Sequence, residues 1–128
     1  MTKPLCGLAA ALLCVLAAGA QAAGDDPMLR LAATSGCLTC HQIEPGGKGP
    51  DGLPPIGPAW REVAAKYRGQ AAAPDQLTLT VMRGSNPYES HWKGKVSGLA
   101  MPPNAVAIKE PEAKKLVGWI LALEPAKK

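Results

Sequence analysis

Residues 36–41 of the chain read GCLTCH, with Cys37 and Cys40 separated by two residues and His41 directly after the second cysteine. This spacing is the pattern by which haem is attached covalently to a polypeptide. Two thiols three positions apart on a helical turn can reach the two vinyl groups along one porphyrin edge and form thioethers. The next residue brings an imidazole nitrogen beneath the iron. The motif predicts one covalently bound haem c, attached at Cys37 and Cys40, with His41 as the proximal iron ligand.

Other chemistries of a cysteine pair fit this chain less well. Zinc requires four ligands and usually a second cysteine pair of the same spacing, which the chain does not have. A thioredoxin-like redox pair lies between a strand and a helix, whereas the segment before Cys37 has the pattern of a short helix. A disulfide across two residues closes a small loop and contributes little stability. The motif therefore favours haem attachment.

The first 22 residues have the features of a secretory signal peptide. Lys3 precedes an uncharged apolar stretch over residues 5–18, and the small residues that follow suit cleavage before Ala23 or one residue later. The stretch is short for a membrane span, so an uncleaved anchor is the less favoured alternative. No lipid anchor is predicted, because neither cysteine in this segment follows a small residue. We expect export to the periplasm and a single cytochrome domain over residues 23–128.

Composition narrows the function of the remaining chain. Without the signal it has 13 Lys and Arg against 10 Asp and Glu, a net charge of +3, and the cations are dispersed among acids rather than gathered in one patch. This distribution does not favour nucleic-acid binding. The chain has no Phe, three Trp and two Tyr, a small aromatic supply for a core. A buried porphyrin would add the missing apolar area.

The remaining pattern predicts an all-α fold of four helices and two long loops. Asp26 and Pro27 mark the first helix start. Ten Gly or Pro among residues 42–59 exclude regular structure there, and residues 85–104 form the second loop. Helical periodicity begins at Trp60, Pro74 opens a shorter helix with Leu77, Val81 and Met82 inward, and Pro111 precedes the clearest amphipathic helix. No alternation typical of strands is found.

The sixth iron ligand has few candidates. Met28 is too close in sequence to Cys37 to reach the other face of the ring, and Met82 fits better as core packing. Met101 is followed by two prolines, which forbid a helix and hold the side chain on a stiff loop. We therefore expect Met101 as the distal ligand. His91 is the remaining competitor, for the iron or for a haem propionate.

The ordered set of motifs resembles one family, the small bacterial class I c-type cytochromes, particularly those that donate electrons to nitrite reductases and terminal oxidases. The resemblance covers almost all of residues 25–123. The motifs that carry it are GCLTCH at 36–41, IGPAW at 56–60, VAAKY at 63–67, RGS at 83–85, MPPNAV at 101–106 and LVGWI at 116–120. The loops at 40–60 and 85–101 are longer here than in the family.

The resemblance implies an all-helical class I cytochrome c fold around one haem, with the first and last helices crossing. It further implies that the Pro58 carbonyl accepts the Nδ1 proton of His41, which fixes the imidazole and makes it a stronger donor. By the same likeness, Asn104 lies near the thioether of Met101 and Trp92 reaches a haem propionate.

With both axial positions filled, the iron has no open site, and the chemistry left to it is outer-sphere transfer of one electron. We expect a monomeric, non-enzymatic carrier between redox proteins, meeting its donor and acceptor transiently and partly by electrostatics, with Lys93 and Lys95 bordering the docking face. One alternative is a haem c subunit of an oxidoreductase complex, with the longer loops as its interface. Another is a catalytic haem with an open site, as in a peroxidase.

Overall fold

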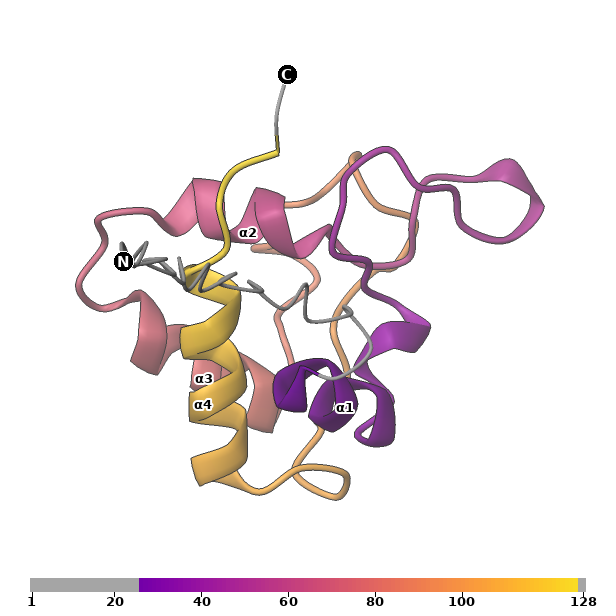
Figure 1. Ribbon diagram of the computed structural model, residues 1–128. Helices are drawn as coiled ribbons and strands as arrows, with labels where there is room; N and C mark the ends of the chain where they lie inside the picture. Colours follow the sequence, from indigo (N-terminus) through magenta and orange to yellow (C-terminus); the bar gives the residue numbers. More distant parts are fainter. Residues whose placement is uncertain (1–25, 127–128) are drawn as a thin grey trace, which may run out of the picture.

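The computed structural model describes residues 26–126, so the predicted signal peptide and its cleavage site lie outside the described residues. Within that range the chain forms four α-helices and no strand (Figure 1). The helices are α1 (Pro27–Thr34), α2 (Trp60–Tyr67), α3 (Ala73–Arg83) and α4 (Glu110–Leu121). Their order and type agree with the prediction. Two short 3₁₀ turns, Cys37–Thr39 and Pro50–Gly52, add to it, and the second is a correction to the expectation of no regular structure between residues 42 and 59.

Helix α4 is the element on which the others pack. Figure 1 shows it beside α1 and α3, with α2 across one end, and α4 contacts all three helices. Its first turn is fixed by the Glu112 carboxylate, which accepts a hydrogen bond from the Lys109 backbone N–H at 3.1 Å. Its apolar face enters the core cluster. That cluster consists of Ala32, Trp60, Val63, Ile108, Ala113, Leu116 and Ile120.

Asp26 joins the two ends of the domain. One carboxylate oxygen accepts the Met28 backbone N–H at 2.8 Å and caps α1, as the sequence predicted. The other oxygen accepts the indole Nε1–H of Trp119 at 3.1 Å. The Trp119 ring meets Trp60 edge to face, with ring centroids 5.9 Å apart. Asp26 therefore links the first helix to the last, and Trp119 links the last helix to the start of α2.

Helix α3 points the predicted residues inward and buries one more. Leu77, Val81 and Met82 are partly buried and pack against the core cluster, as expected. Leu77 and Val81 also line a cavity, which is why they are not fully buried. Thr78 was not predicted to be buried; it is 4% exposed, and its hydroxyl donates to the Pro74 carbonyl at 2.7 Å.

The two long loops meet each other. The backbone N–H groups of Ser97 and Gly98 donate to the carbonyls of Pro55 and Ile56 at 2.9 and 3.0 Å. Close approach requires glycine at position 98, where a Cβ atom would lie 2.5 Å from the Ile56 carbonyl oxygen. The loops thus close one side of the cavity together. None of the helices in residues 26–126 is both long and apolar enough to cross a membrane.

Candidate haem site

A cavity of about 400 Å³ lies between α2, α3, α4 and the two loops, within the ~300–1,000 Å³ range of ligand pockets. Most of its wall is aliphatic or aromatic. The groups with metal or thioether chemistry on this wall are Cys37, Cys40, His41, His91 and Met101. In the described part of the chain, no three His, Cys, Asp or Glu side chains gather as they would around a bare metal ion. Thiols, an imidazole and a thioether around one apolar space fit a porphyrin that carries its own four iron ligands.

The cysteine motif is held in a tight turn. Gly36 precedes it in the left-handed conformation (φ 74°), which turns the chain out of α1. The N–H groups of Cys40 and His41 then both donate to the Cys37 carbonyl, at 3.3 and 3.1 Å. The two thiols are half-buried and not bonded to each other. Burial raises the pKa of the Cys37 thiol, with a smaller contribution from neighbouring Cys40. Both half-buried thiols line the same cavity, and their attachment to haem stays a prediction.

His41 is fixed by two contacts. Its Nδ1 lies 2.8 Å from the Pro58 carbonyl oxygen, and its ring stacks on Trp60 with centroids 6.0 Å apart and planes 26° apart. Burial lowers the pKa of His41, and the Pro58 carbonyl opposes that shift only in part. The ring is therefore favoured as neutral imidazole with its proton on Nδ1. Its Nε2 lone pair remains for a metal.

Gly57 contributes to this site, although only its place in the IGPAW motif singled it out before the structure. Its N–H donates to the Cys40 carbonyl at 2.8 Å. A Cβ atom here would lie 2.8 Å from Cε1, 3.0 Å from Nδ1 and 3.1 Å from Nε2 of His41. The imidazole thus rests against the backbone of Gly57 in a space that only glycine leaves free.

Met101 enters the cavity from the end of the second loop. Ser85 clamps its backbone, because the Ser85 hydroxyl accepts the Met101 N–H at 2.8 Å and the Ser85 N–H donates to the Met101 carbonyl at 2.9 Å. At Gly84 (φ 83°) a Cβ atom would lie 2.8 Å from the same carbonyl oxygen. Met28 and Met82 pack on the core instead. Of the three methionines in the described part of the chain, Met101 alone lines the cavity.

Asn104 secures the segment after Met101. Its side-chain amide donates to the Pro102 carbonyl at 2.7 Å and to the Val81 carbonyl at 3.3 Å, and its backbone N–H donates to Val81 at 3.0 Å. These bonds join the methionine segment to α3. The amide protons are thus engaged by backbone carbonyls, and proximity of Asn104 to the thioether stays a prediction.

Trp92 and His91 lie together on the cavity wall. Trp92 is partly buried and lies near two ammonium groups, with Lys66 Nζ 6.0 Å and Lys95 Nζ 5.9 Å from its ring centroid. The His91 ring meets Tyr67 edge to face at 6.3 Å. Burial raises the pKa of Tyr67. This part of the wall is aromatic with a positive rim, a setting in which a carboxylate is favoured.

The architecture and the chemistry of this cavity define the protein as a small class I c-type cytochrome with an all-α fold, as predicted. The sequence model of the cytochrome c family matches residues 19–124, and the chain belongs to that family. The family carries one covalently bound haem c and acts in electron transport, which confirms the expected cofactor.

Known relatives agree with this assignment. Cytochrome c-551 of Allochromatium vinosum is 42% identical over 95 residues, which cover 74% of this chain and 84% of the relative. Cytochrome c-551 of Pseudomonas aeruginosa is 37% identical over 116 residues, covering 88% of this chain and 94% of the relative. The crystal structure of wild-type Nitrosomonas europaea cytochrome c552 matches with a TM-score of 0.58 at 33% identity, covering 75% of this chain and 99% of that one.

Proposed function

We propose that the protein is a diffusible one-electron carrier whose haem iron is held by His41 and Met101. The single observation that carries this proposal is the shared cavity, which is lined by Cys37, Cys40, the His41 imidazole and the Met101 side chain. The cysteines would form the thioethers. Because the Pro58 carbonyl engages His41 Nδ1, Nε2 would be the nitrogen that binds the iron. Met101 comes from a different segment of the chain, where Ser85 and the two prolines after Met101 hold its backbone.

The reaction follows from this coordination. Haem supplies an iron that changes between the ferrous and ferric states. Because both axial positions would be taken by side chains, no substrate binds to the metal and the chain has only to exclude water and hold the ligands. A thioether ligand and an apolar wall both favour the ferrous state, which raises the reduction potential. The two ammonium groups near the Trp92 ring, those of Lys66 and Lys95, support a propionate position at the aromatic part of the wall.

The absorption spectrum of the purified ferric protein tests the distal ligand. Wild type is expected to show the near-infrared sulfur-to-iron charge-transfer band, and Met101→Ala to lose it and to bind carbon monoxide in the ferrous state. Met82→Leu is the matched control, since Met82 packs on the core and does not line the cavity. A band that survives in Met101→Ala, or wild-type protein that binds carbon monoxide tightly, would contradict the proposal and favour an open catalytic site.

The partners follow from the surface around this site. Lys93 and Lys95 are exposed on the loop that ends at Met101. Replacing both by Glu should slow reduction by an acidic redox protein at low salt, and the difference from wild type should shrink as added salt screens the charges. The matched control replaces Lys109 and Lys115 by Glu. Both are also exposed, but Lys109 directly precedes α4 and Lys115 lies within it. Equal rates in the two double variants would dispose of this docking face.

The periplasm is the proposed location, on the ground of the N-terminal segment described above and of the cytochrome family. Export assays with and without residues 1–22 test it, since only the longer chain should reach the periplasm and acquire haem.

One observation favours the second candidate, a haem subunit of an oxidoreductase complex. Leu53, Tyr88 and Leu99 on the two long loops are 53%, 89% and 84% exposed, which suits a permanent interface better than a solvated surface. Purification from the source organism decides between the two. A free monomer supports the carrier, whereas co-elution with a larger catalytic chain supports the subunit.

A further inference from the structure

Two segments on the His41 side of the cavity run alongside each other in the same direction. These segments are residues 40–44 and 57–61. Backbone hydrogen bonds join them, from Gly57 N to Cys40 O at 2.8 Å, from Trp60 N to Gln42 O at 2.8 Å and from Arg61 N to Ile43 O at 3.2 Å. The 12 residues between the segments form the loop rich in Gly and Pro. Because that loop has little regular structure, the pairing itself must hold the two segments in register.

Two side-chain contacts also join these segments. His41 contacts the residue 17 positions later, Pro58, and Glu44 contacts the residue 17 positions later, Arg61. The first of these contacts orients the proximal imidazole, and the second lies three residues further along both segments. Sliding of one segment past the other would therefore break both contacts together.

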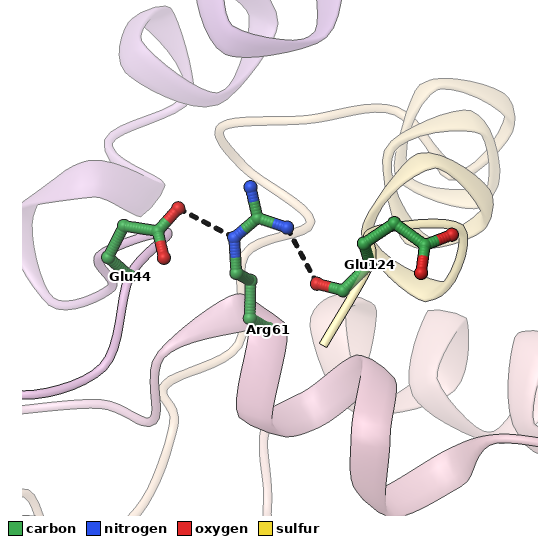
Figure 2. A network of polar contacts seen from close by, with 3 residues as sticks. All are labelled: Glu44, Arg61 and Glu124. Carbon is green, nitrogen blue, oxygen red and sulfur yellow. Dashed lines mark hydrogen bonds and ion pairs between the residues drawn. The ribbon is translucent and has the colours of Figure 1, made fainter. Parts of the chain in front are cut away.

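Arg61 also reaches a third segment (Figure 2). Its Nε donates to the Glu44 carboxylate at 2.6 Å, and its Nη1 donates to the Glu124 backbone carbonyl at 2.6 Å. Glu124 follows α4, the helix whose Leu116 lines the cavity. One guanidinium thus joins the segment after His41, the first turn of α2 and the chain beyond α4. The planar guanidinium presents several N–H donors in fixed directions, so it can bond two acceptors on different segments at once. The single ammonium group of a lysine does not fix its donors in this way.

We infer that Arg61 is a positioning residue for the proximal haem ligand. By locking residues 40–44 onto residues 57–61 and anchoring both to the end of α4, it keeps the Pro58 carbonyl within hydrogen-bond distance of His41 Nδ1. The inference rests on the proposed ligation of iron by His41 and deepens it. The consequence lies in the electronics of the iron, because a carbonyl that accepts the Nδ1 proton makes the imidazole a stronger donor and favours the ferric state.

The other reading, that Arg61 only adds to overall stability, has a matched comparison in the same chain. Lys114 Nζ and Asp75 Oδ1 form a second ion pair at 3.0 Å, which joins α4 to α3 and touches neither paired segment. This pair is more exposed than that of Arg61, so the exchange of the α4 amides is measured in each variant to account for the difference in stability. Lys114→Met therefore removes an ion pair elsewhere on α4 without touching the segments beside His41.

The test uses the haem-loaded protein and nuclear magnetic resonance. The exchange rate of the His41 Nδ1 proton is measured together with the slowest backbone amide protons of α4, which report global opening. In Arg61→Met we expect the exchange of the His41 Nδ1 proton to accelerate at least ten times more than the exchange of the α4 amides does. We also expect the reduction potential to rise. Glu44→Gln and Arg61→Lys should fall between Arg61→Met and wild type. Lys114→Met should match wild type in both the Nδ1 rate and the potential.

Two results would overturn the inference. In one, the Nδ1 proton of Arg61→Met exchanges as in wild type. In the other, it accelerates by the same factor as the α4 amides, which would make Arg61 a general stabiliser. Failure of the underlying ligation is visible without any variant. If wild-type protein shows no His41 ring protons shifted by the iron, the proposed ligand is wrong and the inference falls with it.

Discussion

Replacing Gly57 by alanine places a methyl carbon against the face of the His41 ring. The new carbon would lie 2.8 Å from Cε1 and 3.0 Å from Nδ1. Carbon atoms in favourable contact are ~3.5–4.0 Å apart, so the ring or the backbone must retreat by roughly 0.7 Å. The Nδ1 contact to the Pro58 carbonyl is 2.8 Å long, and a retreat of that size along the bond stretches it past the limit of about 3.2 Å for a good hydrogen bond.

The magnitude combines two costs. Overpacking of a filled site costs about 1–3 kcal/mol, and loss of one hydrogen bond costs about 0.5–1.5 kcal/mol. We therefore expect Gly57→Ala to lower the free energy of unfolding of the haem-loaded protein by about 1.5–4.5 kcal/mol, which is roughly 10-fold to 2,000-fold in the unfolding equilibrium.

Guanidinium unfolding followed by haem absorbance measures this change. Gly118→Ala is the matched control, because Gly118 lies inside α4 and a Cβ atom there meets nothing within 4 Å. Alanine in a helix interior should raise stability by about 0.5–1 kcal/mol. If Gly57→Ala is within about 0.5 kcal/mol of wild type, the claim that His41 rests on the Gly57 backbone is wrong.

Three further predictions concern other parts of the cavity. Burial raises the pKa of Tyr67 in the folded state. The stability that the neutral phenol contributes is therefore complete below the pKa of the unfolded chain, about 10, and is lost as pH rises through the pKa of the folded state. Tyr67→Phe should remove that part of the loss of stability at alkaline pH, and a dependence of stability on pH identical to that of wild type would contradict the prediction. Ser85→Ala leaves the Met101 N–H without its acceptor, so the sulfur-to-iron band should disappear at lower temperature than in wild type, and an unchanged melting of the band would refute the clamp. Replacing Cys37 and Cys40 by serine prevents covalent attachment of haem, and the circular dichroism spectrum should then lose most of its helical signal. A helical signal equal to that of wild type would show that the fold does not depend on haem.

The sequence predicted the helices and the attachment motif because both are local. Asp26 and Pro27 define the start of α1 by capping chemistry, and CLTCH brings three functional groups together within five residues. Burial within α3 was harder to predict, because Thr78 is buried while Leu77 faces a cavity whose position depends on tertiary packing.

The remaining site residues depend on segments that meet only in the folded chain. Gly57 and Arg61 act through a register between residues 40–44 and 57–61, and the intervening loop carries no periodic pattern from which that register could be read. Ser85 acts on Met101 across 16 positions of a second irregular loop. For Gly57 and Ser85 the sequence indicated a motif position, and for Arg61 it indicated none; the structure supplied the contact in all three cases.

The cavity connects the helical scaffold to the cofactor of its family. Most of the cavity wall is aliphatic or aromatic, and a haem bound there would remove apolar surface from water on both sides of the contact, at about 25 cal/mol for each Å². The whole free energy of folding of a domain is about 5–15 kcal/mol, so burial of a few hundred Å² would contribute a large share of the total. The chain has no Phe, and in the described residues none of its large side chains is less than 2% exposed. A bound porphyrin would therefore complete the core, and the contacts that position its proposed ligands also join the elements of the fold.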